Sequence, residues 1–77
     1  MSNVVPITAA YACTEAKARG VLAAVNIAAR QLGYSEHLAY RAGRKAARMV
    51  RERRASPAMI VAMAKRELRD QREPEVA

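Results

Sequence analysis

The sequence predicts an all-α protein: a small three-helix bundle with short connections, a flexible N-terminal arm and a C-terminal tail. Alanine, the strongest helix former, fills 18 of the 77 positions, and most charged residues are arginine or glutamate, which also favour helices. Phe and Trp are absent, and no strand-length alternation of apolar and polar residues occurs beyond Val4–Thr8. Apolar residues instead recur at helical spacing in three segments.

A chain of this length is expected to form one domain over residues 1–77. We divide it into an extended arm (1–8), a helical bundle (9–70) and a solvated tail (71–77). Chains of about this size bury only about 60% of their unfolded surface, so we expect marginal stability.

The first helix is expected over residues 9–32, because one apolar face repeats at i, i+3, i+4 and i+7. Gly33 follows at the position where helices commonly end with a glycine in the left-handed conformation. The apolar face comprises Ala18, Val21, Leu22, Val25, Ala28, Ala29 and Leu32.

The second helix is expected over residues 35–54, with Ser35 as its N-cap and Glu36 in its positive first turn. The third is expected over 57–70, after Ser56 as a cap and Pro57 at the first helical position. Short connections favour antiparallel neighbours, hence a bundle. The apolar stripes are Leu38, Ala39, Ala42, Ala46, Met49 and Val50 in the second helix, and Ile60, Val61, Ala64 and Leu68 in the third.

Small residues form a ridge on the second helix, at Ala39, Gly43 and Ala47. A glycine inside a helix costs about 1 kcal/mol relative to alanine, so Gly43 calls for an explanation. Either another helix of the same chain approaches closely at this ridge, or the ridge is the seam of a homodimer. The sequence leaves both open.

The sequence offers little catalytic chemistry, and we expect no enzymatic activity. Cys13 is the only cysteine, so no internal disulfide can form, and His37 is the only histidine, which excludes a Cys/His zinc cluster. Acids such as Glu15 are spaced as ordinary surface partners, here of Arg19 at i+4. We expect no metal and no cofactor.

We expect a cytoplasmic protein. A single cysteine fits a reducing compartment, and Met1–Thr8 lacks the basic and apolar regions of a signal peptide. The longest apolar run, Gly20–Ala29, is too short to span a bilayer. We also expect no membrane-surface binding, because the apolar face of the basic helix is mostly alanine and glycine.

Positive charge is concentrated in the second helix. Seven of the 14 basic residues lie between Arg41 and Arg54, where Glu52 is the only acid, so this segment carries +6 of the formal charge of +7. Neighbouring like charges each destabilise a helix by a few tenths of a kcal/mol, roughly, which indicates a polyanionic partner. At 100° per residue the cations lie opposite the apolar stripe. The candidate binding residues are Arg41, Arg44, Lys45, Arg48 and Arg51, together called the cationic face, with His37 and Tyr40 beside them.

Nucleic acid is our first choice of partner, because part of the chain resembles a helix-turn-helix. Ala29 and Gly33 occupy the small-residue and turn positions of that motif, with Leu32 and Tyr34 flanking the glycine. The resemblance implies that the second helix faces the major groove or its phosphates through Ser35, His37, Tyr40, Arg41 and Arg44. A plain αα-hairpin explains the same residues and is the preferred interpretation of the turn. Single-stranded RNA is disfavoured, since only three tyrosines could stack on bases.

The alternative is a small protein-binding inhibitor or adaptor. In its small size and its lack of a recognisable active site, the chain resembles small phage-encoded anti-defence proteins, including anti-CRISPRs. The cationic face would then bind an acidic protein surface or a nucleoprotein complex, where charge speeds encounter.

Overall fold

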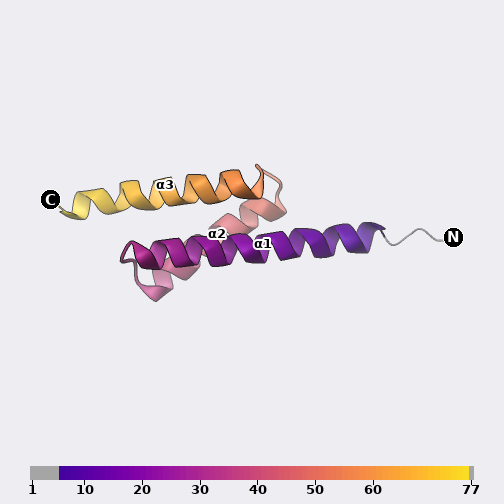
Figure 1. The fold of residues 1–77 in the computed structure, drawn as a ribbon, viewed down its shortest axis with the longest axis horizontal. Helices are drawn as coiled ribbons and strands as arrows, with labels where there is room; N and C mark the ends of the chain where they lie inside the picture. Colours follow the sequence, from indigo (N-terminus) through magenta and orange to yellow (C-terminus); the bar gives the residue numbers. More distant parts are fainter. Residues whose placement is uncertain (1–5, 77) are drawn as a thin grey trace.

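Three helices make up the fold: α1 (Pro6–Gln31), α2 (Glu36–Arg51) and α3 (Pro57–Val76). The computed structural model describes the backbone of residues 6–76 and the side chains of residues 12–71. α1 and α3 form one layer and run in the same direction, while α2 returns behind them (Figure 1). The all-α three-helix bundle is therefore confirmed, and residues 6–76 contain no strand.

The helices differ from the predicted bounds at their ends. α1 begins at Pro6, so residues 6–8 of the predicted arm are helical, because a proline loses no hydrogen bond at the first helical position. α3 continues to Val76 through most of the predicted tail, Pro74 included, although proline inside a helix is unfavourable. Residues 1–5 of the arm and residue 77 lie outside the described residues.

A glycine ends α1, as the sequence predicts. Gly33 has φ 98°, which is the left-handed conformation that glycine adopts without penalty. The N–H of Tyr34 donates to the carbonyl of Ala29 at 3.0 Å, and the N–H of Gly33 donates to that of Arg30 at 3.0 Å. This pair of bonds is a Schellman motif, and it turns the chain directly into α2 to form an αα-hairpin.

The same motif ends α2, with an arginine in the glycine position. Arg53 has φ 56° and donates its N–H to the carbonyl of Val50 at 3.0 Å, while Arg54 donates to Met49 at 3.1 Å. α2 therefore stops at Arg51 and not at residue 54. Nothing in the residue type signals this stop, because arginine rarely adopts a positive φ.

Serine side chains cap the starts of α2 and α3. The Oγ of Ser35 accepts from the N–H of Leu38 at 3.2 Å, and the Oγ of Ser56 accepts from the N–H of Met59 at 3.2 Å. Pro57 occupies the first position of α3. Both predicted helix starts are confirmed, the first displaced by one residue to Glu36 because Ser35 is the cap itself.

The core is narrow and rich in alanine. Its largest fully buried side chains are only Ile60 and Val25. The hydroxyl of Tyr34, in the first connection, donates to the carbonyl of Leu68 at 2.5 Å and so fastens the hairpin turn to α3. The buried apolar residues are Ala18, Val21, Val25, Ala29, Ala39, Ala46, Ala47, Val50, Ile60 and Leu68.

The small-residue ridge of α2 lies against α1 of the same chain. Ala39, Gly43 and Ala47 are all buried, and a Cβ added to Gly43 would lie 2.8 Å from the backbone oxygen of Leu22. Glycine is therefore needed for the approach of α1. Of the two explanations that the sequence leaves open, the contact within the chain is the one observed.

Candidate functional site

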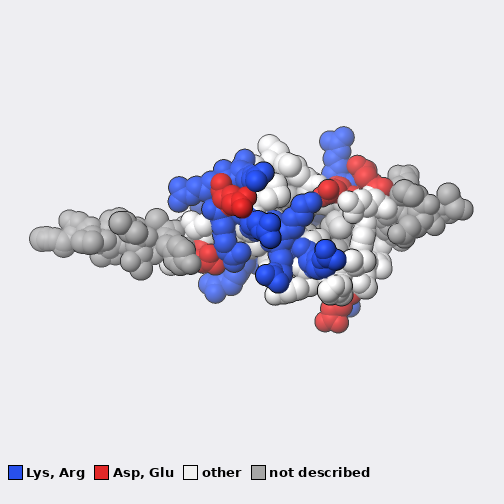
Figure 2. Space-filling model, turned by 180° about the vertical axis from the view of Figure 1, so that it is seen from behind, with Lys and Arg blue, Asp and Glu red and all other residues white. Residues whose placement is uncertain are grey.

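The outward side of α2 carries the central part of the cationic face. Arg41, Arg44 and Arg48, here called the outer arginines, are exposed, as is His37 in the first turn. Seen from the α2 side, lysine and arginine side chains form a band across the middle of the molecule (Figure 2). The band arises because the helix buries alanine, glycine and valine on its other side, so cations at i, i+3 and i+7 all point to solvent.

The outer arginines make no ion pair with any acid of the described residues. Arg44 instead lies over the ring of Tyr40, with its guanidinium carbon 5.9 Å from the ring centroid. This cation–π distance leaves the edges of the guanidinium able to donate to an anion. The three arginines thus present their hydrogen-bond donors to whatever approaches α2 from outside.

Arg51 has a different role from its predicted one. Its Nε and one terminal nitrogen donate to the two carboxylate oxygens of Glu15 in α1, at 2.9 and 3.2 Å. Glu15 was expected to pair with Arg19, which instead contributes only through its charge. The hydrogen bond from Arg51 is the main cause that lowers the pKa of Glu15 below its usual 4.5. Arg51 therefore links α2 to α1, and its guanidinium is already engaged with Glu15 when a partner approaches.

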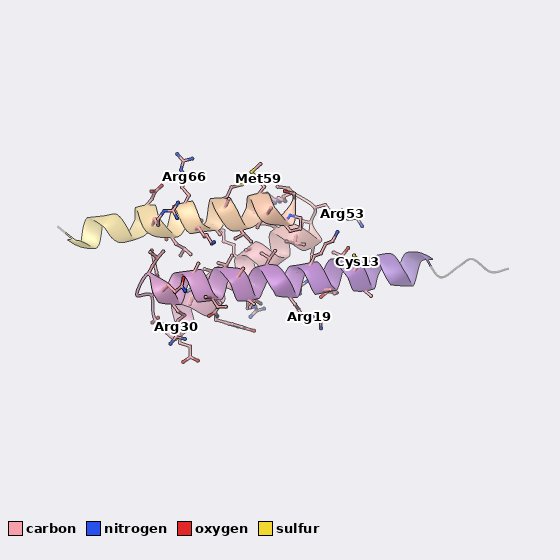
Figure 3. All side chains as sticks on the ribbon, in the orientation of Figure 1. Cys13, Arg19, Arg30, Arg53, Met59 and Arg66 are labelled. Carbon is pink, nitrogen blue, oxygen red and sulfur yellow. The ribbon has the colours of Figure 1, made fainter. Side chains whose placement is uncertain are left out.

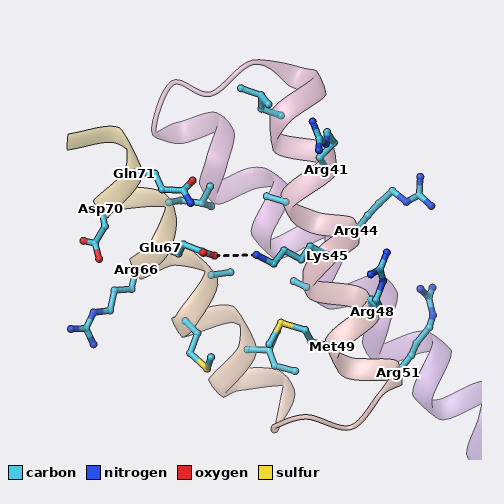
Figure 4. Close-up of a pocket in the computed structure, with 17 residues that line it drawn as sticks. Arg41, Arg44, Lys45, Arg48, Met49, Arg51, Arg66, Glu67, Asp70 and Gln71 are labelled. Atoms are coloured by element: carbon cyan, nitrogen blue, oxygen red, sulfur yellow. Dashed lines mark ion pairs between the residues drawn. The ribbon is translucent and has the colours of Figure 1, made fainter. Parts of the chain in front are cut away.

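Lys45 is also drawn away from the outer arginines. Its Nζ lies 3.8 Å from a carboxylate oxygen of Glu67 in α3. In Figure 4, Lys45 extends from α2 toward α3, while Arg44, Arg48 and Arg51 extend from the other side of the helix. The predicted cationic face is thus divided into outer arginines, a lysine directed at α3 and an arginine bound to α1.

A groove lies between α2 and α3, with a volume of about 1170 Å³. Its apolar surface includes Leu38, which is 47% exposed although it was predicted as part of the buried stripe. Sequence reasoning missed this groove, since its width depends on the spacing of two helices. The remaining apolar lining is Ala42, Ala46, Met49, Ile60, Met63, Ala64 and Leu68.

Other residues singled out by the sequence serve the fold or lie apart. Ser35 caps α2 and Tyr34 binds α3, so these two positions of the helix-turn-helix resemblance are used internally. Cys13 is exposed in the N-terminal half of α1, and His37 lies beyond the turn at the other end of that helix (Figure 3). The structure does not bring this thiol and imidazole together.

Within the described residues, no three His, Cys, Asp or Glu side chains are grouped so that they could hold a metal ion. None of the helices searched has the length and apolar character required to cross a bilayer. Comparison of the chain with known protein families, curated proteins and solved structures gives no match.

Proposed function

We propose that the chain is a non-enzymatic binding protein whose outer arginines contact the phosphates of a nucleic acid, with duplex DNA as the first candidate. The observation that carries the proposal is that Arg41, Arg44 and Arg48 share one exposed face and lack acidic partners among the described residues. Planar guanidinium groups donate in pairs to phosphate oxygens, which makes arginine well suited to this contact.

The spacing of the outer arginines also suits a phosphate backbone. Arg41 and Arg48 are two helical turns apart, which is about 10 Å along the axis of α2. Over that length one strand of B-DNA presents roughly three phosphates, at about 3.4 Å of helix rise each. Contacts of this kind position a protein on the duplex without reading its sequence. His37 and Tyr40 lie on or beside the same face and are the candidates for contacts beyond the backbone.

The test is a salt titration of binding to labelled random duplex DNA, with Arg41→Gln/Arg44→Gln/Arg48→Gln compared with the wild type. If three phosphates are neutralised, log K should fall against log salt with a slope of about −2.7 in the wild type. The triple variant should lose most of this slope. Glutamine keeps helix propensity close to that of arginine, so the fold should be retained.

A matched control removes the same charge elsewhere. Arg30, Lys65 and Arg69 are exposed and outside the groove, and Figure 3 shows Arg30 pointing away from α3. Arg30→Gln/Lys65→Gln/Arg69→Gln also lowers the formal charge of +7 by three. The proposal requires this control to keep the wild-type slope. Equal loss in both variants would mean that net charge alone attracts the DNA, and no binding by the wild type would refute the proposal.

The alternative of a protein partner is favoured by a separate observation. The groove between α2 and α3 exposes apolar side chains that phosphate contacts would leave uncovered.

A further inference from the structure

Several apolar side chains, and not a single isolated one, form the surface of the α2–α3 groove. Leu38 of α2 is 47% exposed and Met63 of α3 is 48% exposed, and both line the groove. The half-buried Met49 of α2 and the buried Ile60 of α3 also line the groove. Long apolar side chains from two helices thus face one open channel. Contiguous apolar surface that is bordered by polar residues is typical of an interaction site.

The two walls of the groove differ in charge. The α2 wall carries the outer arginines and Lys45 and has no acid, whereas the α3 wall mixes Arg66 with Glu67 and Asp70. In Figure 4 Lys45 extends from α2 into the groove toward α3, whereas Arg44, Arg48 and Arg51 extend from the outer side of α2, and Arg66 extends away from the groove. An occupant is therefore complementary when it is apolar at its base and acidic along the flank that faces α2.

The length of the groove fits a helix. Its α2 wall runs from Leu38 to Arg51, which corresponds to about 20 Å of helix axis. A helix of about 13 residues has that length, and its apolar residues at i, i+3, i+4 and i+7 form one stripe. Methionine side chains suit such a surface, because they are flexible and adapt to different apolar shapes.

We propose that this groove binds an amphipathic helix from an acidic protein partner. The apolar stripe of the partner lies on Leu38, Met49 and Met63, and its carboxylates pair with the cations of α2. The proposal does not rest on nucleic-acid binding, because a DNA backbone has no apolar stripe to place in the channel. It assigns a second surface, next to the outer arginines, to a different class of partner.

The Lys45–Glu67 ion pair joins the two walls of the groove. The two groups are 3.8 Å apart, and their side chains are 68% and 53% exposed. Exposed pairs of this kind hold weakly, so an incoming helix can separate them. Lys45 then exchanges Glu67 for a carboxylate of the partner, and Glu67 is left to repel acids from the α3 side. The acidic flank of the partner must therefore face α2.

The methionines of the chain allow a direct test. Met49 and Met63 line the groove, whereas Met59 is 54% exposed on α3 outside it. Protein with ¹³C-methyl methionine is titrated with a designed 14-residue helix of leucine, alanine and glutamate, with leucines in one stripe and glutamates along one flank. We expect the methyl signals of Met49 and Met63 to shift and that of Met59 to stay.

Two comparison peptides separate the proposal from plain charge attraction. One has the same composition in scrambled order, so that it has no apolar stripe, and the other carries lysine in place of each glutamate. Both should bind at least ten-fold more weakly than the probe. Equal binding of the scrambled peptide, or shifts limited to amides of the outer arginines, would overturn the proposal. No binding of the probe at 1 mM, roughly the weakest affinity of interest, would also overturn it.

Two variants that alter no charge test whether the probe binds in the groove. Leu38→Gln/Met63→Gln removes apolar surface from the groove, and because both residues are half exposed the fold should tolerate the change. We expect at least a ten-fold loss of probe affinity and unchanged DNA binding. The matched control is Ile27→Gln/Met59→Gln, at residues 56% and 54% exposed outside the groove, which should bind the probe as the wild type does. Equal affinity of the two variants for the probe would overturn the proposal. If the wild type binds the probe but not DNA, the DNA-binding proposal fails and this one stands.

Discussion

Replacing Gly43 with alanine tests how closely α1 and α2 approach. In most helix interiors this change stabilises a protein, because alanine exceeds glycine in helix propensity by about 1 kcal/mol. Here the new Cβ would lie 2.8 Å from the backbone oxygen of Leu22 and 3.2 Å from its Cγ. A side chain can rotate away, but a backbone oxygen inside α1 moves only if the whole helix moves.

The expected magnitude follows from two opposing effects. Overpacking of a close contact costs about 1–3 kcal/mol, and contact with backbone belongs in the upper part of that range. After subtraction of the propensity gain of about 1 kcal/mol, Gly43→Ala should lower the free energy of unfolding by about 1–2 kcal/mol. In a domain of this size each 1 kcal/mol corresponds to a change of about 4–8 °C in Tm.

Gly20 supplies the control on the same pair of helices. It is exposed in α1, and a Cβ added there meets nothing within 4 Å. Gly20→Ala should therefore raise stability by about 0.5–1 kcal/mol, opposite in sign to Gly43→Ala. Both are measured by urea unfolding followed by circular dichroism at 222 nm. If Gly43→Ala is as stable as Gly20→Ala, the helices lie farther apart than described and the reasoning is refuted.

Two further predictions concern the second connection and the α1–α2 ion pair. Arg53→Gly should raise the urea midpoint by an amount equivalent to about 1 kcal/mol, because φ 56° is costly for arginine and not for glycine; an unchanged midpoint would contradict the left-handed assignment. Glu15→Gln should be less stable than the wild type at neutral pH, since it loses the charge that binds Arg51. Because folding lowers the pKa of Glu15, the ionised carboxylate contributes its full share of the folding stability above about pH 4.5. This contribution disappears as the pH falls through the lowered pKa of the folded state. The difference in Tm between the wild type and Glu15→Gln should therefore narrow from pH 7 to pH 3. A Tm difference that stays constant over this range would contradict the Glu15–Arg51 ion pair.

Features that depend on neighbouring residues could be predicted from the sequence. Ser35 and Ser56 were recognised as caps because capping involves only the next three residues, and Gly33 because glycine is typical of the left-handed end of a helix. The apolar stripes and the exposure of the outer arginines follow from the helical period alone. The predicted end of α2, at residue 54, lies beyond the observed end at Arg51, because Arg53 adopts a positive φ that its residue type does not indicate.

Features that depend on the spacing of helices could not be predicted. Glu15 and Arg51 are 36 residues apart, so their pairing replaced the local one expected with Arg19. Leu38 follows the period of the buried stripe, yet it is 47% exposed, because burial also depends on which helix packs against that turn. The groove likewise depends on how α2 and α3 pack. For the same reason the sequence could not decide between the two explanations of Gly43, since both need the identity of the helix facing it.

The alanine-rich core has a consequence for how long the chain survives in a cell. Each buried alanine contributes one methyl group, so the core described above yields little of the transfer free energy that larger side chains would supply. A partner that binds only the folded form at 100 times its Kd adds about 2.7 kcal/mol, which lowers the unfolded fraction by about a hundred-fold. Proteases that degrade the unfolded form would then remove the free chain much faster than the bound one. The amount of this protein would follow the supply of its partner.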